Sequence, residues 1–170
     1  MITLYFHSGK LSWKDWALRF IQIFSDDPCF HVGGQYKTEP LIIESTSKRG
    51  VDIRPLNHYH DLICNNGRKI SAYSCLAEID EKAFWAWMLS QCDHKYDWWG
   101  VIGLGLAQLR GADAKNKWVA KKDFWCSELF MRGLRLHALN VDAFDDIPDN
   151  GIVKPSHMKN SKWISFKYNL

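Results

Sequence analysis

The chain has 170 residues, enough for one domain with a hydrophobic core, and 46% hydrophobic and 24% charged residues are the composition of a globular protein. A net charge of +3 is too small to predict nucleic-acid binding. The five cysteines are odd in number and include no C-x-x-C pair, which argues against a disulfide framework or a zinc knuckle and favours a reducing compartment.

The N-terminus runs directly into an apolar, strand-like pattern from Met1 to Phe6, without a basic region or a small-residue cleavage site. No apolar run approaches the length that crosses a bilayer. We therefore expect a protein that is cytoplasmic as synthesised, that has no integral membrane segment and that does not bind nucleic acid.

Hydrophobic periodicity and turn residues predict a mixture of strands and helices, with no repeat or linker that would divide the chain. We therefore expect a single domain over residues 1–170. The predicted elements are a strand over 2–6, an amphipathic helix over 12–24, strands over 30–35, 41–46 and 51–56, a polar connection over 57–68, a strand over 70–79, a helix over 80–94, a short helix over 101–109, a basic loop over 110–122, a helix over 124–138, loops over 141–150 and 151–161, and a strand over 163–168.

Cys126 lies in the first turn of the helix predicted over 124–138, with Asp123 as its N-cap. There the unpaired N–H groups and the positive end of the helix dipole favour a thiolate, which is the nucleophilic form of cysteine. The same position also suits a cysteine that is only a small apolar residue of a buried helix. The pattern around Cys126 leaves both interpretations open.

The strands over 30–35 and 41–46 have the pattern of a hairpin. If its turn is centred between Lys37 and Thr38, His31 lies opposite Glu44, with Cβ atoms about 5 Å apart. A carboxylate at that place fixes the tautomer of the imidazole, which is the base that a thiol nucleophile needs. A register shift of one residue would put the two side chains on opposite faces. Without Cys126 as a partner, His31 would be an ordinary half-buried strand histidine.

The sequence offers no convincing set of metal ligands. His58 and His60 are the nearest thing to a metal-binding pair, and they lack a clear third ligand, so we interpret them as part of a polar loop. We expect neither a metal nor another cofactor.

Four short segments, in this order, resemble a known family: Phe30-His31-Val32-Gly33, Ile43-Glu44-Ser45, Gly50-Val51 and Phe124-Trp125-Cys126-Ser127-Glu128-Leu129. They are similar to the circularly permuted NlpC/P60 proteins, the YiiX-like and poxvirus-related branch of the papain-like cysteine hydrolases. In that branch a strand of the "SHVGI" type carries a histidine and precedes a helix of the "CSEL" type that carries a cysteine. The resemblance extends from Ile2 to the Pro155-Ser156 segment. Phe30 and Gly34 depart from it, since the family has a serine and an aliphatic residue there.

The resemblance implies an α+β, papain-like fold, in which an antiparallel, curled sheet packs against the helix that bears the nucleophile. It implies that Cys126 is the nucleophile, that His31 is the general base and that Glu44 orients His31. The segment from Tyr96 to Gly100 resembles the family's Y-x-W-G element. Tyr96 is therefore a further candidate, whose hydroxyl would bind the oxyanion together with the backbone N–H of Cys126.

These roles imply a thiol hydrolase, a cysteine peptidase or amidase that cleaves an amide, peptide or other acyl substrate through an acyl-enzyme. Common substrates in the superfamily are the peptides of bacterial peptidoglycan, and a cell-wall enzyme without a signal peptide would need phage or secretion machinery for export. A papain-like module that binds without turnover, a lipid-directed acyl hydrolase or acyltransferase, and a thiol redox sensor are the alternatives. The acyltransferase branch uses an "NCEHF" helix, which the segment from Trp125 to Leu129 does not match.

Overall fold

The computed structural model describes residues 1–9, 11, 19, 22, 28–110, 116, 118, 123–148 and 153–170. Within them a six-stranded antiparallel sheet has the strand order β4-β3-β2-β1-β5-β6. The strands are β1 (Thr3–Gly9), β2 (Cys29–Gln35), β3 (Leu41–Thr46), β4 (Gly50–Pro55), β5 (Arg68–Cys75) and β6 (Ile164–Asn169). The helices are α2 (Asn57–Asn66), α3 (Glu81–Ser90), α4 (Trp98–Arg110), α5 (Cys126–His137) and α6 (Pro155–Lys159).

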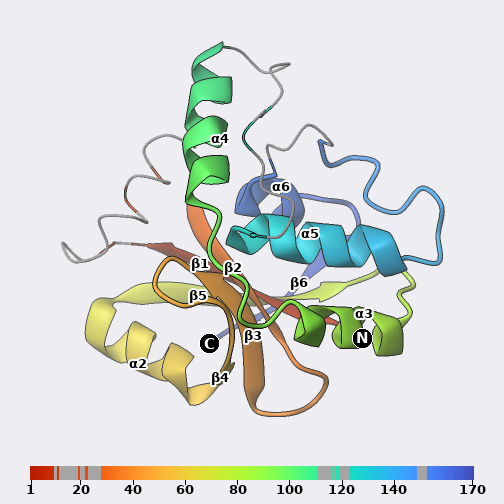
Figure 1. Cartoon of the computed structure of the whole chain (residues 1–170). Coiled ribbons are helices and arrows are strands. Elements are labelled where there is room, and N and C mark those ends of the chain that lie inside the picture. The colour runs from red at the N-terminus through yellow and green to blue at the C-terminus, as the bar shows by residue number, and fades with distance from the viewer. Residues whose placement is uncertain are drawn as a thin grey trace.

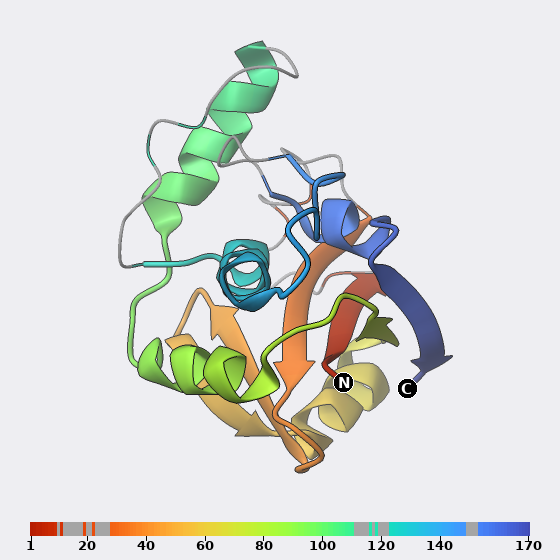
Figure 2. The same ribbon diagram turned by 90° about the vertical axis from the view of Figure 1, so that its right-hand side faces the viewer.

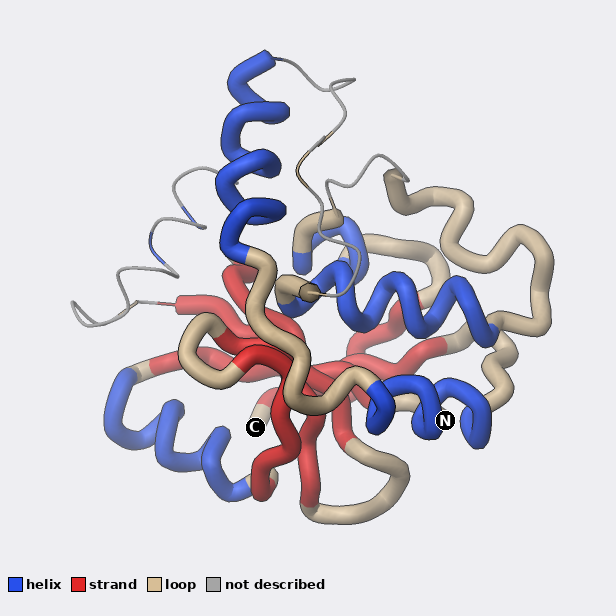
Figure 3. Tube along the Cα trace, viewed as in Figure 1, coloured by secondary structure: helices blue, strands red, loops and turns tan. Residues whose placement is uncertain are grey.

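The sheet lies between two groups of helices, with α2 on one face and α3, α5 and α6 on the other (Figure 1 and Figure 3). Strand β1 shows how the alternation of side chains serves both layers. Leu4 and Phe6 belong to the larger core beneath α3 and α5, whereas Tyr5 belongs to a smaller core beneath α2. The α+β class and the antiparallel, curled sheet that the sequence predicts are confirmed (Figure 2).

The polar connection predicted over 57–68 is wrong, because this segment forms α2. Tyr59, Leu62 and Ile63 follow helical spacing and pack in the core beneath that helix. No Gly or Pro interrupts the segment, and Gly67 ends it with φ of 62° while its N–H donates to the Ile63 carbonyl at 3.1 Å. The high polarity of the segment hides this short apolar stripe.

Helix α5 begins at Cys126, and its N-cap is Trp125, not Asp123. Trp125 has an extended backbone and offers no capping side chain. The backbone N–H groups of the first turn therefore lack the side-chain acceptor that Asp123 was expected to supply. The correction moves Cys126 to the first residue of the helix.

Helices α4 and α6 and strand β5 also differ from the prediction. Helix α4 begins at Trp98, before the expected break at Gly100, because Asp97 accepts a hydrogen bond from the Gly100 N–H at 2.7 Å and caps the helix. Strand β5 ends at Cys75, and Ile79 forms only an isolated bridge. The predicted loop over 151–161 contains the short helix α6. The helix predicted over 12–24 and most of the loop predicted over 110–122 lie outside the described residues.

Candidate active site

The first turn of α5 is fixed by hydrogen bonds from both sides. Ser45 of β3 donates its hydroxyl to the Phe124 carbonyl at 2.6 Å. The indole of Trp125 and the hydroxyl of Ser127 both donate to the Val153 carbonyl, at 3.1 and 2.7 Å. All three donors are buried, so these bonds are screened little by water. They hold Cys126, which is 4% exposed, at the end of β3 that carries Glu44.

His31 and Glu44 meet, although not in the register that the sequence predicts. The backbone pairing of β2 with β3 joins Gly33 to Glu44 and ends there, so the partner expected for Glu44 is wrong by two residues. The turn is centred one residue later than expected, because the Tyr36 N–H donates to the Leu41 carbonyl. A shift of two residues keeps both side chains on one face. The His31 Nε2 atom lies 2.8 Å from the Glu44 Oε2 atom.

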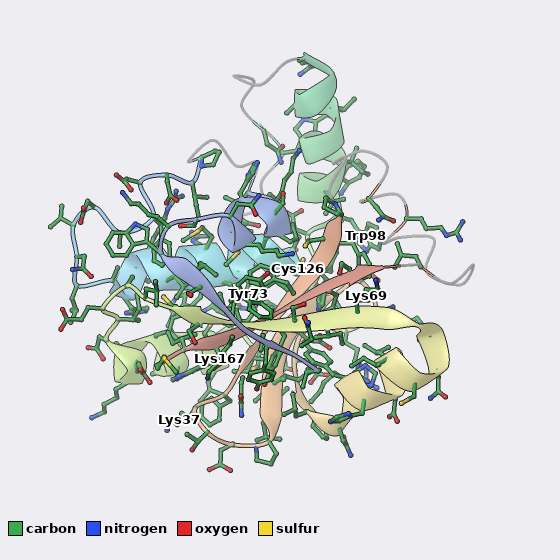
Figure 4. All side chains as sticks on the ribbon, turned by 180° about the vertical axis from the view of Figure 1, so that it is seen from behind. Lys37, Lys69, Tyr73, Trp98, Cys126 and Lys167 are labelled. Atoms are coloured by element: carbon green, nitrogen blue, oxygen red, sulfur yellow. The ribbon has the colours of Figure 1, made fainter. Side chains whose placement is uncertain are left out.

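Cys126, the first residue of α5, completes a row with His31 and Glu44. Its thiol and the His31 side chain form a hydrogen bond. Because Nε2 of His31 binds Glu44, Nδ1 is the ring nitrogen left for Cys126. The three predicted catalytic residues are thus brought together, from β2, β3 and α5. Figure 4 shows Cys126 at the end of α5 nearest to the base of α4, where Trp98 lies.

The interactions among Cys126, His31 and Glu44 shift the pKa values of His31 and Glu44. Burial acts to lower the pKa of His31, but hydrogen bonds to Cys126 and Glu44, together with their negative charges, outweigh it and raise the pKa to about 9. Burial acts to raise the pKa of Glu44, but the bond to His31 and its positive charge hold the pKa at about 2. At neutral pH the protonated imidazole beside an ionised Glu44 is therefore favoured.

Two residues that sequence reasoning missed hold the other lone pairs of Glu44. The Tyr59 hydroxyl of α2 donates to Glu44 Oε2 at 3.1 Å, and the Arg54 guanidinium lies 3.5 Å from Oε1. Burial, and then the charge of Glu44, raises the pKa of Tyr59 well above its ordinary value, so its hydroxyl remains a donor. The helical spacing of Tyr59 with Leu62 was the signal that could have placed it beneath the sheet.

Gly33 and Gly34 make room for side chains on opposite faces of β2. A Cβ atom at Gly33 would lie 2.1 Å from the Tyr59 hydroxyl oxygen, and one at Gly34 would lie 2.4 Å from Cε1 of Phe130 in α5. Gly33 thus lets Tyr59 reach Glu44. Gly34, which departs from the family pattern, lets the ring of Phe130 lie against the strand.

His7 is a second histidine within this site, and no pattern in the sequence selects it. It is the cross-strand partner of His31, is fully buried, and packs edge-on against the rings of His31 and Tyr59, with centroids 4.8 and 4.5 Å apart. Neither of its ring nitrogens has a hydrogen-bond partner among the described residues. Burial, and then the charge of His31, lowers the pKa of His7 well below 6.5, so the ring is neutral.

Tyr96 lies near Cys126 in the folded chain. It packs with Val101 and Trp125, the residue before Cys126. Burial, and then the negative charges of Cys126 and Asp97, raises the pKa of Tyr96 well above its ordinary value. The hydroxyl therefore keeps its proton and can donate a hydrogen bond.

An acidic pair accompanies Tyr96. Glu128, in the first turn of α5, is close enough to Asp97 for that carboxylate, after burial, to raise the pKa of Glu128 to about 8. Its Oε2 atom is buried and has no hydrogen-bond partner among the described residues. The carboxyl group of Glu128 is therefore mostly neutral at pH 7, on the same helical turn as Cys126.

His58 and His60 do not form a metal site with a third residue. Both lie on α2, where the Arg54 guanidinium lies 2.7 Å from Nε2 of His58 and where His60 is exposed. Within the described part of the chain, His, Cys, Asp and Glu side chains form no group of three that could hold a metal ion.

No protein-family model matches the chain, and no curated protein sequence matches it. The resemblance to the permuted NlpC/P60 proteins therefore stays a prediction. Among the described residues, no helix has both the length and the apolar character that crossing a bilayer requires.

Proposed function

We propose that this chain is a cysteine hydrolase with a permuted, papain-like arrangement, which cleaves an amide or peptide bond through an acyl-enzyme. The observation that carries the proposal is the buried row of Glu44, His31 and Cys126, in which one imidazole binds a carboxylate at Nε2 and a thiol through the remaining nitrogen. A thiol nucleophile, a base and a group that orients the base are the three parts that such a hydrolase needs.

Before the substrate reacts, the proton of the Cys126 thiol passes to His31, which leaves a thiolate beside the imidazolium. In the first half of the reaction, this thiolate attacks the carbonyl carbon of the substrate. The oxyanion that forms would accept hydrogen bonds from the N-terminal N–H groups of α5 and from the Tyr96 hydroxyl. When the C–N bond breaks, His31 gives its proton to the leaving amine, and the acyl group remains on Cys126 as a thioester.

In the second half, His31 takes a proton from water, and the oxygen of that water attacks the thioester carbonyl. The C–S bond then breaks, the acid leaves, and the proton returns to the sulfur of Cys126. Glu44 keeps the ring in one orientation through both halves and stabilises its protonated form, while Tyr59 and Arg54 hold Glu44. Peptides of the bacterial cell wall are one substrate class that fits this chemistry.

The test is the rate at which iodoacetamide alkylates Cys126 between pH 5 and 9, located by peptide mass spectrometry. The exposed Cys64 serves as a control in the same molecule. We expect Cys126 to react faster than Cys64 at neutral pH despite its burial, and His31→Ala to remove that advantage, because the imidazolium stabilises the thiolate. Acetylation of Cys126 by p-nitrophenyl acetate would then show whether a thioester forms.

If Cys126 reacts more slowly than Cys64, or if His31→Ala leaves its rate unchanged, the site does not activate a nucleophile and the proposed function is wrong. A papain-like module that binds without turnover would then account for the fold.

A further inference from the structure

Two tryptophans are held in contact with each other at the surface, beside the candidate site. Trp99, in the first turn of α4, is 68% exposed, and Trp118 is 47% exposed. Their ring centroids are 6.0 Å apart at an interplanar angle of 82°. Large aromatic rings are seldom left so open to water, and tryptophan gathers at surfaces that meet a lipid–water boundary.

The pair continues into an apolar stripe along α4. Trp99, Ile102 and Leu106 follow helical spacing, and Trp99 is exposed while the other two are half-buried. The exposed Arg110 ends this stripe with a positive charge. Val101 and Ala107, by contrast, are buried. Helix α4 points away from the sheet in both Figure 1 and Figure 2, so this stripe runs along the part of the molecule that stands furthest from the sheet.

A buried amide fixes the position of Trp118. Asn116 is 8% exposed, donates to the Gly100 carbonyl at 2.8 Å, and accepts from the Trp118 N–H at 3.0 Å. A Cβ atom at Gly103 would lie 2.1 Å from the Asn116 side-chain oxygen, so Gly103 provides the space for the amide. Because the buried Asn116 amide makes both of these hydrogen bonds, the position of Trp118 beside Trp99 is part of the folded structure.

The sequence around Trp118 supplies positive charge. Residues 110–122 include five basic side chains and one acidic side chain, a net charge of +4, and Lys117 is adjacent to Trp118. Tryptophan and lysine together are the composition of segments that bind anionic lipid surfaces. An acidic protein surface would also attract the lysines, but it would give no reason for an open pair of tryptophan rings.

The base of α4 connects this surface to the nucleophile. A Cβ atom at Gly100 would lie 2.3 Å from the Trp125 ring, so helix and ring are in close contact directly before Cys126. Trp98 packs on Tyr96, with ring centroids 5.2 Å apart. Trp99 therefore lies on the helix that borders the candidate site, and Trp118 packs against Trp99. Figure 4 shows Trp98 at the base of this helix, near Cys126.

We propose that Trp99, Trp118 and the stripe along α4 form a membrane-docking surface that binds anionic lipid bilayers. As a consequence, which rests on the proposed function, the substrate of Cys126 is an acyl or amide group carried at the surface of a membrane. Binding at the surface needs no spanning helix.

The test is co-sedimentation of the full chain with sucrose-loaded vesicles, of phosphatidylcholine alone or mixed with phosphatidylglycerol, at low and high salt. We expect the chain to bind the mixed vesicles, and salt or the neutral vesicles to weaken binding. Trp99→Ser/Trp118→Ser should lower the partition coefficient about tenfold or more. Asn116→Ala should also lower it, because the Trp118 ring is no longer held against Trp99. The control is Phe166→Ser on β6, a ring of 56% exposure outside this surface, which should bind as the unchanged chain does.

The proposal is overturned if the unchanged chain does not bind the mixed vesicles, or if the double variant binds them as well as Phe166→Ser does. It is also overturned if sedimentation without vesicles shows a dimer that the double variant converts to a monomer, since the surface would then bind a second copy. Alkylation of Cys126, measured on the same variants without vesicles, separates the two proposals. An unreactive Cys126 with intact vesicle binding refutes only the proposed function.

Discussion

His31 and Glu44 are joined by a 2.8 Å hydrogen bond although neither is the other's cross-strand partner. Glu44 lies opposite Gly33, so its carboxylate reaches diagonally along the face to the imidazole two residues earlier on β2. Diagonal neighbours on a sheet are far enough apart that only long side chains can meet. Glutamate has that reach, and the absence of a side chain at Gly33 keeps the path open.

The His31–Glu44 bond predicts a pH window for stability. The folded pKa of His31, about 9, is above its unfolded value of 6.5, so this contribution is complete below pH 6.5 and is lost as the pH rises through about 9. The folded pKa of Glu44, about 2, is below its unfolded value of 4.5, so this contribution is complete above pH 4.5 and is lost as the pH falls through about 2. Both contributions are complete between pH 4.5 and 6.5.

In that window we expect Glu44→Gln to lower the free energy of unfolding by about 1–3 kcal/mol, because a buried charged hydrogen bond is lost. Urea unfolding at pH 3, 5.5 and 10 measures the difference, and Glu39→Gln, at an exposed turn position, is the control. If Glu44→Gln lowers the free energy of unfolding by the same amount at all three pH values, the bond is not between charged groups.

Gly33 and Tyr59 are predicted to be energetically coupled. Gly33→Ala places a methyl group 2.1 Å from the Tyr59 hydroxyl oxygen, and we expect it to destabilise the chain by about 1–3 kcal/mol. Tyr59→Phe removes the colliding oxygen, so the double variant should be more stable than the sum of the two single changes allows. Gly34→Ala is the matched control, because its methyl group would meet Phe130 on the other face. Rescue of both alanine variants by Tyr59→Phe, or of neither, would contradict the coupling.

The sequence predicted the order of the six strands along the chain, the helix that carries Cys126, and a shared face for His31 and Glu44. The last prediction survived an error of two residues in register because side chains alternate with period two, and an error of one residue would have separated the pair. The helix that carries Cys126 was found because its apolar positions recur over more than three turns.

The sequence did not predict the residues around the row of Cys126, His31 and Glu44. Tyr59 was missed because α2 is short and polar, so its stripe is weak beside its many polar residues. His7 was missed because its role depends on which strand lies beside β2, and pairing between strands far apart in sequence leaves no local pattern. The raised pKa of Glu128 depends on its burial and then on the charge of Asp97, and both arise only in the folded chain.

Glu128 is predicted to weaken the fold as the pH rises. Its folded pKa, about 8, is above its unfolded value of 4.5, so between these values the folded chain binds the proton more firmly. Stability is therefore lost as the pH rises through this range. Glu128→Gln cannot ionise, so we expect it to gain stability relative to the unchanged chain from pH 5 to pH 8.5. Thermal unfolding at both values measures the effect, and NMR titration of the carboxyl carbon checks the pKa directly. An equal difference at the two pH values would mean that Glu128 is ionised in the folded chain throughout.

We predict that His7 lowers the stability of the fold and that His7→Phe would raise it. Both ring nitrogens are buried and have no partner among the described residues, so His7→Phe should raise the free energy of unfolding by about 1–3 kcal/mol at pH 7.5 while it keeps a ring against His31 and Tyr59. The folded pKa of His7 is below its unfolded value of 6.5, so below pH 6.5 the unfolded chain binds an extra proton. The advantage of the variant should therefore widen there, by up to about 1.4 kcal/mol per pH unit.

Urea unfolding from pH 7.5 to 5 measures this slope, with His60→Phe as the control at an exposed histidine of α2. His7→Ala should destabilise the chain at every pH, because it leaves a cavity beside His31. If His7→Phe is instead less stable than the unchanged chain at every pH, the ring nitrogens of His7 have a hydrogen-bond partner such as a bound water, and that bond stabilises the fold. The alkylation rate of Cys126 in the same variant then shows whether loss of that bond affects Cys126 through His31.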